Sequence, residues 1–549
     1  MRQHFIAALV TITLVGCGGS SSSPSSNPEL GETVPDPGNP DTLQPRGPDA
    51  VGLDTSSLSC AAQAQCGKRA SADNVSFCWC DEDCESNNDC CDDFAQECEV
   101  GCDAGQTDCG SDGLAIKSNA IPEPYGWTYY RKVHGEIDGV DTYVTCRDGS
   151  KSGYAISLGR NGEENNVLIR IEGGGACFNE HSCILSPYEY NEYWFHKAVV
   201  NDPLKFHILP IRPGVFNRDK DENPFKDWTY VYVPHCTGDV GVGQNSDQTI
   251  PGLEVPFPLP PFGPGFLKKT NTFQGWNNFE IIVNDLLKQL ESATDSQGDE
   301  IRVDRYILSG DSAGGFGAMG HYKHFKSLVE ADTNPNRNPD VVIDVLDDSG
   351  APIATGPEGL ASCLQDRMWE KWGLKNTVGN NYCPSCGPES FLLPMAVEAI
   401  TAVATAGRYA GFEDSQHDKV LAGFFGFGLD DCRQLDEKSV QGPTQKHTPL
   451  TPEQYETALR AGLDQMVQAA VAGHGGPDQP NFRYFILAGD DHASNQLPAL
   501  YTRTSNGVRL IDWVTGLANE NDSGEWNNVA PWTCIDEDSS ADSCGDNRP

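Results

Sequence analysis

Positive charge is scarce in this sequence of 549 residues. Its 38 lysines and arginines stand against 79 aspartates and glutamates, which gives a formal net charge of −41. A nucleic-acid partner would need a basic face that neutralises phosphates, so the charge balance argues against nucleic-acid binding. It also argues against adhesion to anionic lipid, whereas it favours solubility and repels polyanions.

Long apolar runs are lacking as well. The apolar stretch FIAALVTITLV is too short to span a bilayer, and no other stretch could do so. It follows Arg2 and leads into LVGC, the layout of an export signal that ends at a lipid-carrying cysteine. We therefore expect a lipoprotein signal peptide over residues 1–16 and a lipid anchor on Cys17. The expected location is the outer membrane or cell surface of a bacterium, which Gly18 fits better than an aspartate would.

Apolar periodicity is absent from the next segment, whose composition is dominated by Ser, Pro, Gly, Asn and Asp. Residues 17–57 are therefore expected to be the lipidated cysteine and a flexible linker. Cysteine, by contrast, is plentiful, with 21 in the chain. Setting the lipidated one aside leaves an even number, which in an exported protein predicts disulfides rather than metal thiolates.

A cysteine-dense module occupies residues 58–110, too short a segment to bury much core without disulfides. Its pattern C-x-C-x3-C-x5-CC-x6-C resembles the somatomedin B domain, which implies a four-disulfide knob that often contacts proteins. A partner-binding knob and a plain spacer both remain open. The candidate disulfide cysteines of this module are Cys60, Cys66, Cys78, Cys80, Cys84, Cys90, Cys91 and Cys98.

Residues 115–530 alternate between short apolar runs and helical patterns, and an acidic tail follows at 531–549. Runs such as NNVLIRIEGGG, DRYILSG and NFRYFILAGDDH end in Gly, Asp or His, as buried parallel strands do. The alternation predicts an α/β fold, namely a doubly wound and mostly parallel sheet. Functional residues in such sheets lie at the carboxyl ends of the strands.

The segment GDSAG, at 310–314, fits G-x-S-x-G between an expected strand and an expected helix. A nucleophilic serine on this turn projects above the sheet, and small neighbours avoid a clash. The amide of Ala313, at the start of the helix, would then face a developing negative charge. We interpret Ser312 as a nucleophile, and the alternative is a plain turn residue.

A serine nucleophile needs a base and an acid, which follow it in the order Ser, Asp or Glu, His. His492 comes directly after an apolar strand and is the candidate base, with a surface-loop histidine as the alternative. By chain order alone the acid could be Asp347, Asp348 or Asp414.

The segment EGGGACFNEHSC, at 172–183, brings a strand into three glycines. Such loops supply backbone amides to an oxyanion, although a simple turn would look the same. Cys177 and Cys183 are expected to close a small disulfide loop here. No metal or cofactor is expected, because HCTGD (235–239) lacks a second ligand pair and CPSC (383–386) fits a structural disulfide.

Four segments in this order, EGGGACFNEHSC, VPHCTGDVGVG, GDSAGG and VLDDSG, resemble the pectinacetylesterase/Notum family over about residues 120–500. The resemblance implies an α/β-hydrolase-like fold and a triad of Ser312, His492 and an aspartate. Because FEDSQ is similar to the family motif Y-D-S-x-Q, the aspartate is expected to be Asp414. The oxyanion donors implied by the resemblance are Gly174, Gly175 and Ala313.

The expected function is that of a serine carboxylic-ester hydrolase that removes acetyl or other short acyl groups from a glycan or related ester. The family usually has a tryptophan in the glycine-rich loop, and Ala176 in this sequence would open the acyl side of the pocket. One alternative is a depolymerase or lipase acting on a polymer or lipid ester. Another is an inactive surface adhesion or scaffold protein that acts through the cysteine-rich module.

Overall fold

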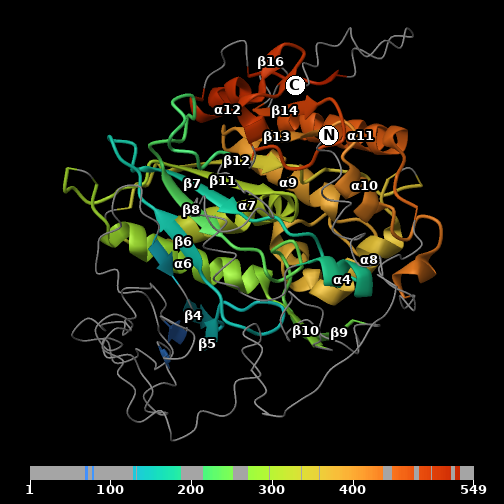
Figure 1. The fold of residues 1–549 in the computed structure, drawn as a ribbon, viewed down its shortest axis with the longest axis horizontal. Coiled ribbons are helices and arrows are strands. Elements are labelled where there is room, and N and C mark those ends of the chain that lie inside the picture. Colours follow the sequence, from blue (N-terminus) through green and yellow to red (C-terminus); the bar gives the residue numbers. More distant parts are fainter. Residues whose placement is uncertain are drawn as a thin grey trace, which may run out of the picture.

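The structure is a computed structural model (Figure 1). It describes residues 69–71, 77–79, 128–130, 133–186, 214–250, 270–295, 297–335, 337–357, 359–436, 448–474, 481–495, 498–520 and 526–531. The expected signal peptide, Cys17, the linker and nearly all of the acidic tail lie outside these residues. The side chains of the cysteine-rich module are not described either, so its eight candidate disulfide cysteines stay predictions.

One sheet of eight strands organises the fold, in the order β14-β13-β12-β11-β7-β8-β6-β3. The strands from β14 to β8 run parallel, and β6 and β3 add antiparallel pairs at one edge. This confirms the expected mostly parallel sheet. The strands are β3 (Thr128–Tyr130), β6 (Tyr154–Ser157), β7 (Asn166–Ile171), β8 (Thr229–Val233), β11 (Arg305–Asp311), β12 (Val342–Asp348), β13 (Ala410–Ser415) and β14 (Phe482–Leu487).

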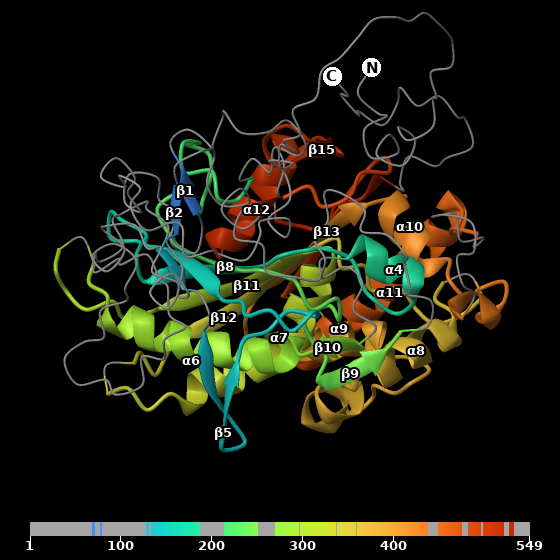
Figure 2. The same cartoon turned by 60° about the horizontal axis from the view of Figure 1, so that its bottom comes forward.

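Helices cover both faces of this sheet, as Figure 2 shows. One face carries α6 (Gly275–Ser292), α7 (Ala313–Ala331), α9 (Leu392–Thr405) and α11 (Pro452–His474), and the other carries α12 (Leu510–Ala518). In α6 the apolar residues recur every three or four positions and are buried from Phe279 to Leu290. Cover on both faces explains why β8 and β11 are buried along their whole length.

Smaller elements complete the described fold. Short antiparallel pairs are β1 (Arg69–Ser71) with β2 (Phe77–Trp79), β4 (His134–Ile137) with β5 (Val140–Tyr143), β9 (Asn245–Thr249) with β10 (Thr270–Phe273), and β15 (Thr504–Ser505) with β16 (Val508–Arg509). Short helices are α4 (Glu180–Leu185), α8 (Ser362–Trp372), α10 (Lys419–Phe425), η5 (Leu374–Asn376), η6 (Val378–Tyr382), η7 (Cys432–Leu435) and η8 (Pro498–Tyr501).

The described residues contain four disulfides, two of which join distant parts of the chain. They are Cys146–Cys236, Cys177–Cys183, Cys363–Cys432 and Cys383–Cys386. The second confirms the expected small loop after the glycines, and the last confirms the structural interpretation of CPSC. Within HCTGD, the carboxylate of Asp239 accepts hydrogen bonds from the Thr237 hydroxyl and from two backbone amides, which makes it a structural residue.

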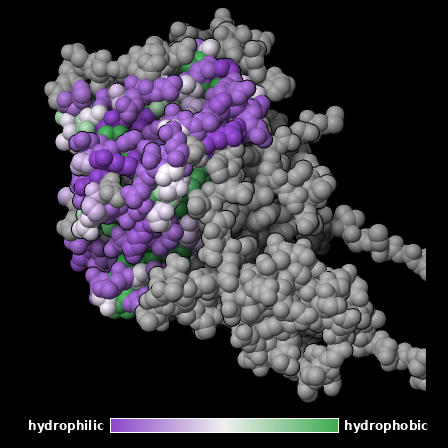
Figure 3. Space-filling view, turned by 90° about the vertical axis from the view of Figure 1, so that its left-hand side faces the viewer, coloured by the Kyte–Doolittle hydropathy of each residue, from purple (hydrophilic) through white to green (hydrophobic). Residues whose placement is uncertain are grey.

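The described surface is strongly hydrophilic. In Figure 3 the described part of the face in view is mostly purple, with small scattered hydrophobic spots. No helix among the described residues is long and apolar enough to cross a bilayer. The apolar side chains are instead collected on the two sides of the sheet, in a large cluster under α6, α7, α9 and α11 and a smaller one under α12.

Candidate active site

Ser312 occupies a sharp turn between β11 and α7, at the carboxyl end of a central strand. Its backbone has φ 53° and ψ −119°, a conformation that a residue with a side chain rarely adopts. Strain of this kind is typical of functional turns that must aim a side chain. The Ser312 amide donates to the Asp348 carbonyl at 2.7 Å, which ties the turn to the end of β12.

The two glycines of the motif allow the chain to pass within contact distance of itself. A Cβ on Gly310 would lie 2.1 Å from the carbonyl oxygen of Gly314. A Cβ on Gly314 would lie 2.1 Å from the carbonyl oxygen of Ile171, on neighbouring strand β7. The expected strand–turn–helix is therefore present, and backbone contacts make it rigid.

The glycine-rich loop after β7 packs directly on this turn. A Cβ on Gly173 would lie 3.1 Å from the Cβ of Ser312. Gly175 has φ 77°, which favours glycine, and its carbonyl accepts from Nε2 of His235 at 3.2 Å. Ala313 begins α7, so its amide belongs to the first turn, whose amides have no acceptor within the helix. The loop thus lies beside the turn, as the expected oxyanion donors Gly174, Gly175 and Ala313 require.

His492 follows β14 and contacts a carboxylate that the sequence interpretation did not choose. Its Nδ1 lies 2.5 Å from Oδ2 of Asp418. Asp418 is fully buried, and its Oδ1 accepts from the amides of Val420 (2.8 Å) and Leu421 (3.0 Å), so it caps α10. The contact at Nδ1 leaves Nε2 of His492 for a second partner.

The electrostatic surroundings keep the imidazole of His492 basic. Burial alone would lower its pKa, but the carboxylates of Asp418, Asp348 and Asp311 outweigh burial and raise the pKa above the ordinary histidine value. No hydrogen bond joins Ser312 to His492 among the described residues. Such catalytic bonds are often long before a substrate is bound.

Asp414 does not hold His492, so the expected pairing is corrected. Its Oδ2 accepts from the hydroxyl of Tyr455 at 2.6 Å, and its Oδ1 accepts from the amide of Ser415 at 2.7 Å. Asp414 belongs to β13, and its side chain points toward α11, which carries Tyr455. Asp418 lies four residues further on, after the chain has turned toward the loop that follows β14.

The other two candidate acids, Asp348 and Asp347, also form hydrogen bonds with groups other than His492. Asp348 Oδ2 accepts from Arg170 at 3.1 Å and from the amide of Asn495 at 3.0 Å. Asp347 Oδ1 accepts from the amide of Gly350 at 2.8 Å. Arg170 is itself buried and forms a second ion pair with Asp311 at 3.2 Å. These contacts tie together the strand ends below the site.

Sequence reasoning could have found Asp418 from its capping signal. An aspartate directly before the apolar helical segment KVLAGFF is a typical N-cap, and the segment starts at 419. The capping signal places the residue at a helix start but does not say which side chain that start approaches.

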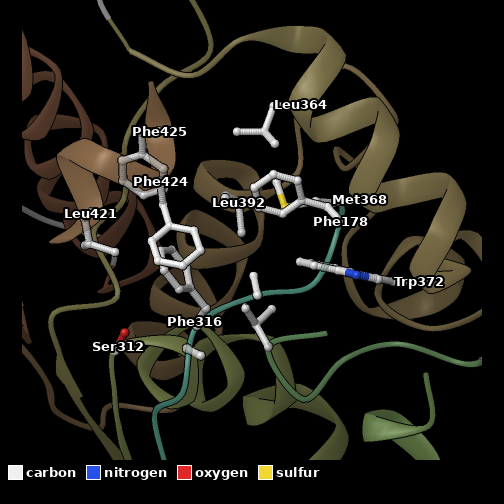
Figure 4. Close-up of a pocket in the computed structure, with 14 residues that line it drawn as sticks. Phe178, Ser312, Phe316, Leu364, Met368, Trp372, Leu392, Leu421, Phe424 and Phe425 are labelled. Carbon is white, nitrogen blue, oxygen red and sulfur yellow. The ribbon is translucent and has the colours of Figure 1, made fainter. Parts of the chain in front are cut away.

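A pocket opens beside Ser312, and its volume is about 460 Å³ when the solvent-open space at its mouth is included. Figure 4 shows the residues that line it. Apart from the serine, its walls are apolar or glycine, and α10 supplies three of the side chains. Trp372 lies across the pocket from Ser312 in this view. The lining residues are Gly175, Ala176, Phe178, Val240, Ser312, Ala313, Phe316, Leu364, Met368, Trp372, Leu392, Leu421, Phe424 and Phe425. Such walls suit an apolar group next to the reacting carbon.

Two family models match this chain. Residues 134–397 match the pectinacetylesterase family, and residues 58–101 match the somatomedin B domain. Both resemblances seen in the sequence are thereby confirmed.

Relatives of known name align with parts of the chain. Palmitoleoyl-protein carboxylesterase notum2 of Xenopus laevis is 26% identical over 226 residues, which cover 41% of this chain and 38% of that protein. Pectin acetylesterase 7 of Arabidopsis thaliana is 25% identical over 189 residues, covering 34% and 39% respectively. The aligned part therefore spans less than two fifths of either relative.

A solved structure of the Wnt deacylase Notum from Drosophila aligns over 71% of this chain and 94% of that chain. The two are 15% identical, and the TM-score is 0.42. At this level of similarity the fold assignment depends on the sheet order and helix layers described above.

Proposed function

We propose that the pectinacetylesterase-family domain of this chain is a serine carboxylic-ester hydrolase. The observation that carries the proposal is the meeting, at one edge of the sheet, of two features. One is the strained Ser312 turn with its glycine loop, and the other is the hydrogen-bonded pair of His492 and Asp418. These are the parts that acyl transfer through a serine needs: a nucleophile, a base held by an acid, and backbone amides.

The proposed reaction proceeds in two steps. The hydroxyl of Ser312 attacks the ester carbonyl while Nε2 of His492 takes its proton, and the alcohol leaves with that proton. Asp418 holds Nδ1 of the ring and stabilises the imidazolium. The amides of Gly174, Gly175 and Ala313 stabilise the oxyanion. Water, activated by the same histidine, then releases the acid and regenerates the serine.

The pocket supports an acyl group longer than acetyl. An acetyl group would contact only a small part of these apolar walls with its single methyl. Each buried methylene contributes about 0.8 kcal/mol, so a longer chain would use these walls better. The relatives are named for a palmitoleoyl-protein ester and for pectin acetate, so both lengths occur among similar proteins. The pocket favours the alternative of a lipid-like or polymer ester over the acetyl or other short acyl ester of a glycan that the sequence leads us to expect first.

Location and partners remain predictions from the sequence. The expected export signal and the lipid on Cys17 would hold the enzyme at the outer membrane or cell surface. There the ester substrate would belong to a glycan, polymer or lipid, and the somatomedin B region would be free to contact a protein. The absence of acyl-transfer activity in a folded protein would favour the alternative role of a surface scaffold.

The test is hydrolysis of p-nitrophenyl esters from acetate to decanoate by the chain lacking residues 1–16 and its Ser312→Ala variant. We expect hydrolysis that is lost in the variant and that rises from acetate to octanoate. Equal hydrolysis by both proteins would overturn the serine mechanism. A preference for acetate that falls with chain length would keep the esterase but reject the apolar acyl group.

A further inference from the structure

A second buried carboxyl group lies behind the one that holds the histidine. The side chains of Asp414 and Asp418 lie within hydrogen-bonding reach of each other. Both are buried, with exposed fractions of 1% and 0%. Two carboxylates carry no donor between them, so this contact requires one of the pair to hold a proton. The question is which one.

The neighbouring donors assign the negative charge to Asp418. Its two oxygens accept from His492 and from two amides in the first turn of α10. A helix N-terminus favours a negative charge, and so does an imidazole that becomes cationic during the reaction. Asp414 has only the Tyr455 hydroxyl and the amide of its neighbour Ser415.

We propose that Asp414 is a positioning residue, a neutral carboxylic acid that donates its proton to the carboxylate of Asp418 and so fixes that carboxylate on Nδ1 of His492. The proposal rests on the proposed function, because it concerns the base of that reaction. It differs from the sequence expectation in kind. The sequence leads us to expect Asp414 as the ionised partner of the histidine. In the proposal Asp414 is uncharged and acts on the histidine only through Asp418.

The surroundings of the pair are consistent with a neutral Asp414. Burial raises the pKa of Asp414 well above the usual aspartate range, and the neighbouring charge of Asp418 raises it further. Tyr455, from α11, stays a neutral donor because burial and these carboxylates raise its pKa as well. The charged or titratable groups that face this pair and its histidine are Tyr455 from α11, Glu413 from β13, Asp347 and Asp348 from β12, Asp311 from β11 and His492 from the loop after β14.

The donated proton has a consequence for the base. It adds a fourth hydrogen bond to the three that Asp418 accepts from His492 and from two amides, so less of the carboxylate charge acts on the imidazole. It also restrains rotation of that carboxylate. Without the donor, Asp418 would present its full charge to His492 and raise the pKa of the imidazole further. The imidazole must be neutral to accept the serine proton, so activity would then appear only at a higher pH.

The experiment compares Asp414→Asn, Asp414→Ala and Asp418→Asn by their kcat/KM for p-nitrophenyl octanoate from pH 5 to 9. An asparagine amide can still donate to Asp418, and the Tyr455 hydroxyl can rotate to accept from it. We therefore expect kcat/KM of Asp414→Asn to stay within about threefold of the parent value. Its acid limb, the rise of kcat/KM on the low-pH side of the profile, should stay at the same pH. We expect Asp414→Ala to lose roughly tenfold and to shift its acid limb to higher pH. Asp418→Asn should lose about 10⁴-fold.

Two results would overturn the proposal. An Asp414→Asn variant as inactive as Asp418→Asn would mean that a charged Asp414 is required. An Asp414→Ala variant with parental activity and an unmoved acid limb would mean that the donor has no role. Because Asp414→Asn is nearly isosteric, the first result decides the matter even if the alanine variant does not fold.

A matched control is Glu413→Gln, the same acid-to-amide change at the adjacent residue of β13. Glu413 is also buried, but its side chain meets Asp348 instead of Asp418. The thermal midpoint of Glu413→Gln shows how much stability such a change removes in this strand. We expect the acid limb of this variant to stay at the parental pH. The Ser312→Ala variant keeps the tests separate: full activity there would reject the proposed function itself and not the role of Asp414.

Discussion

The two sides of the proposed site are built by different means: the nucleophile side, around Ser312, and the base side, around His492. On the nucleophile side, the turn at Ser312 packs so closely on backbone atoms that a Cβ on Gly310 or Gly314 would not fit. The loop at Gly173 packs as closely, against the backbone and the carboxylate of Asp311. On the base side, His492 is held by side chains, through a helix cap and a pair of buried carboxyl groups. We infer that the first side is sensitive to volume and the second to charge.

The largest expected effect removes charge from the base side. Asp418→Asn should reduce kcat by about 10⁴-fold, because an amide cannot hold the imidazole in its required tautomer or stabilise its charge. The measurement is kcat for p-nitrophenyl octanoate with thermal unfolding alongside. The control is Asp490→Asn, an exposed acid paired with Lys419 near the same helix. A drop of less than tenfold in Asp418→Asn would show that another group holds the histidine.

The corresponding change on the nucleophile side adds volume. A methyl at Gly314 would meet the carbonyl of Ile171, so Gly314→Ala should lower the free energy of unfolding by about 1–3 kcal/mol and impair turnover. Gly423→Ala, in α10, meets no atom within 4 Å and should be neutral or stabilising by up to about 1 kcal/mol. Urea unfolding of both variants checks this, and equal stability of the two would contradict a backbone-packed turn.

A smaller effect concerns the pocket that lies between the two sides. Phe424→Ala should reduce kcat/KM for octanoate roughly tenfold while leaving acetate nearly unchanged, because apolar wall area is lost only to the longer chain. Phe216→Ala makes the same truncation beside the cluster under α12 and should change neither substrate. A uniform loss for both esters in Phe424→Ala would mean that the phenylalanine supports the fold instead of the acyl chain.

The smallest effect is a shift along the pH axis. Because the carboxylates raise the pKa of His492, the acid limb of kcat/KM should lie above pH 6.5, the ordinary value for histidine. For the same reason the contribution of His492 to folding stability is complete below the unfolded pKa and is lost as pH rises through the folded pKa. A kcat/KM profile with its acid limb at or below pH 6.5 would contradict the conclusion that the carboxylates outweigh burial in setting the pKa of His492.

The sequence by itself determined what depends on local chemistry. The glycines around Ser312, the triple glycine after β7, the apolar runs of the strands and the cysteine pairs at 177–183 and 383–386 are each readable within a dozen residues. Every one of them has its expected structure where the structure describes it. Steric limits on a tight turn act between neighbours in the chain, so their signature stays in the sequence.

The choice of acid was decided only by tertiary structure. Asp414 and Asp418 are four residues apart in one segment, and both satisfy the required chain order. Which of them reaches His492 depends on where β13 ends, where α10 begins, and where the loop after β14, more than 70 residues later, returns to the same edge. The pocket was likewise decided only by tertiary structure, because its walls come from the glycine-rich loop, α7, α8, α9 and α10. Contacts between such distant segments leave no local pattern, and the protonation that Asp414 acquires by burial leaves none either.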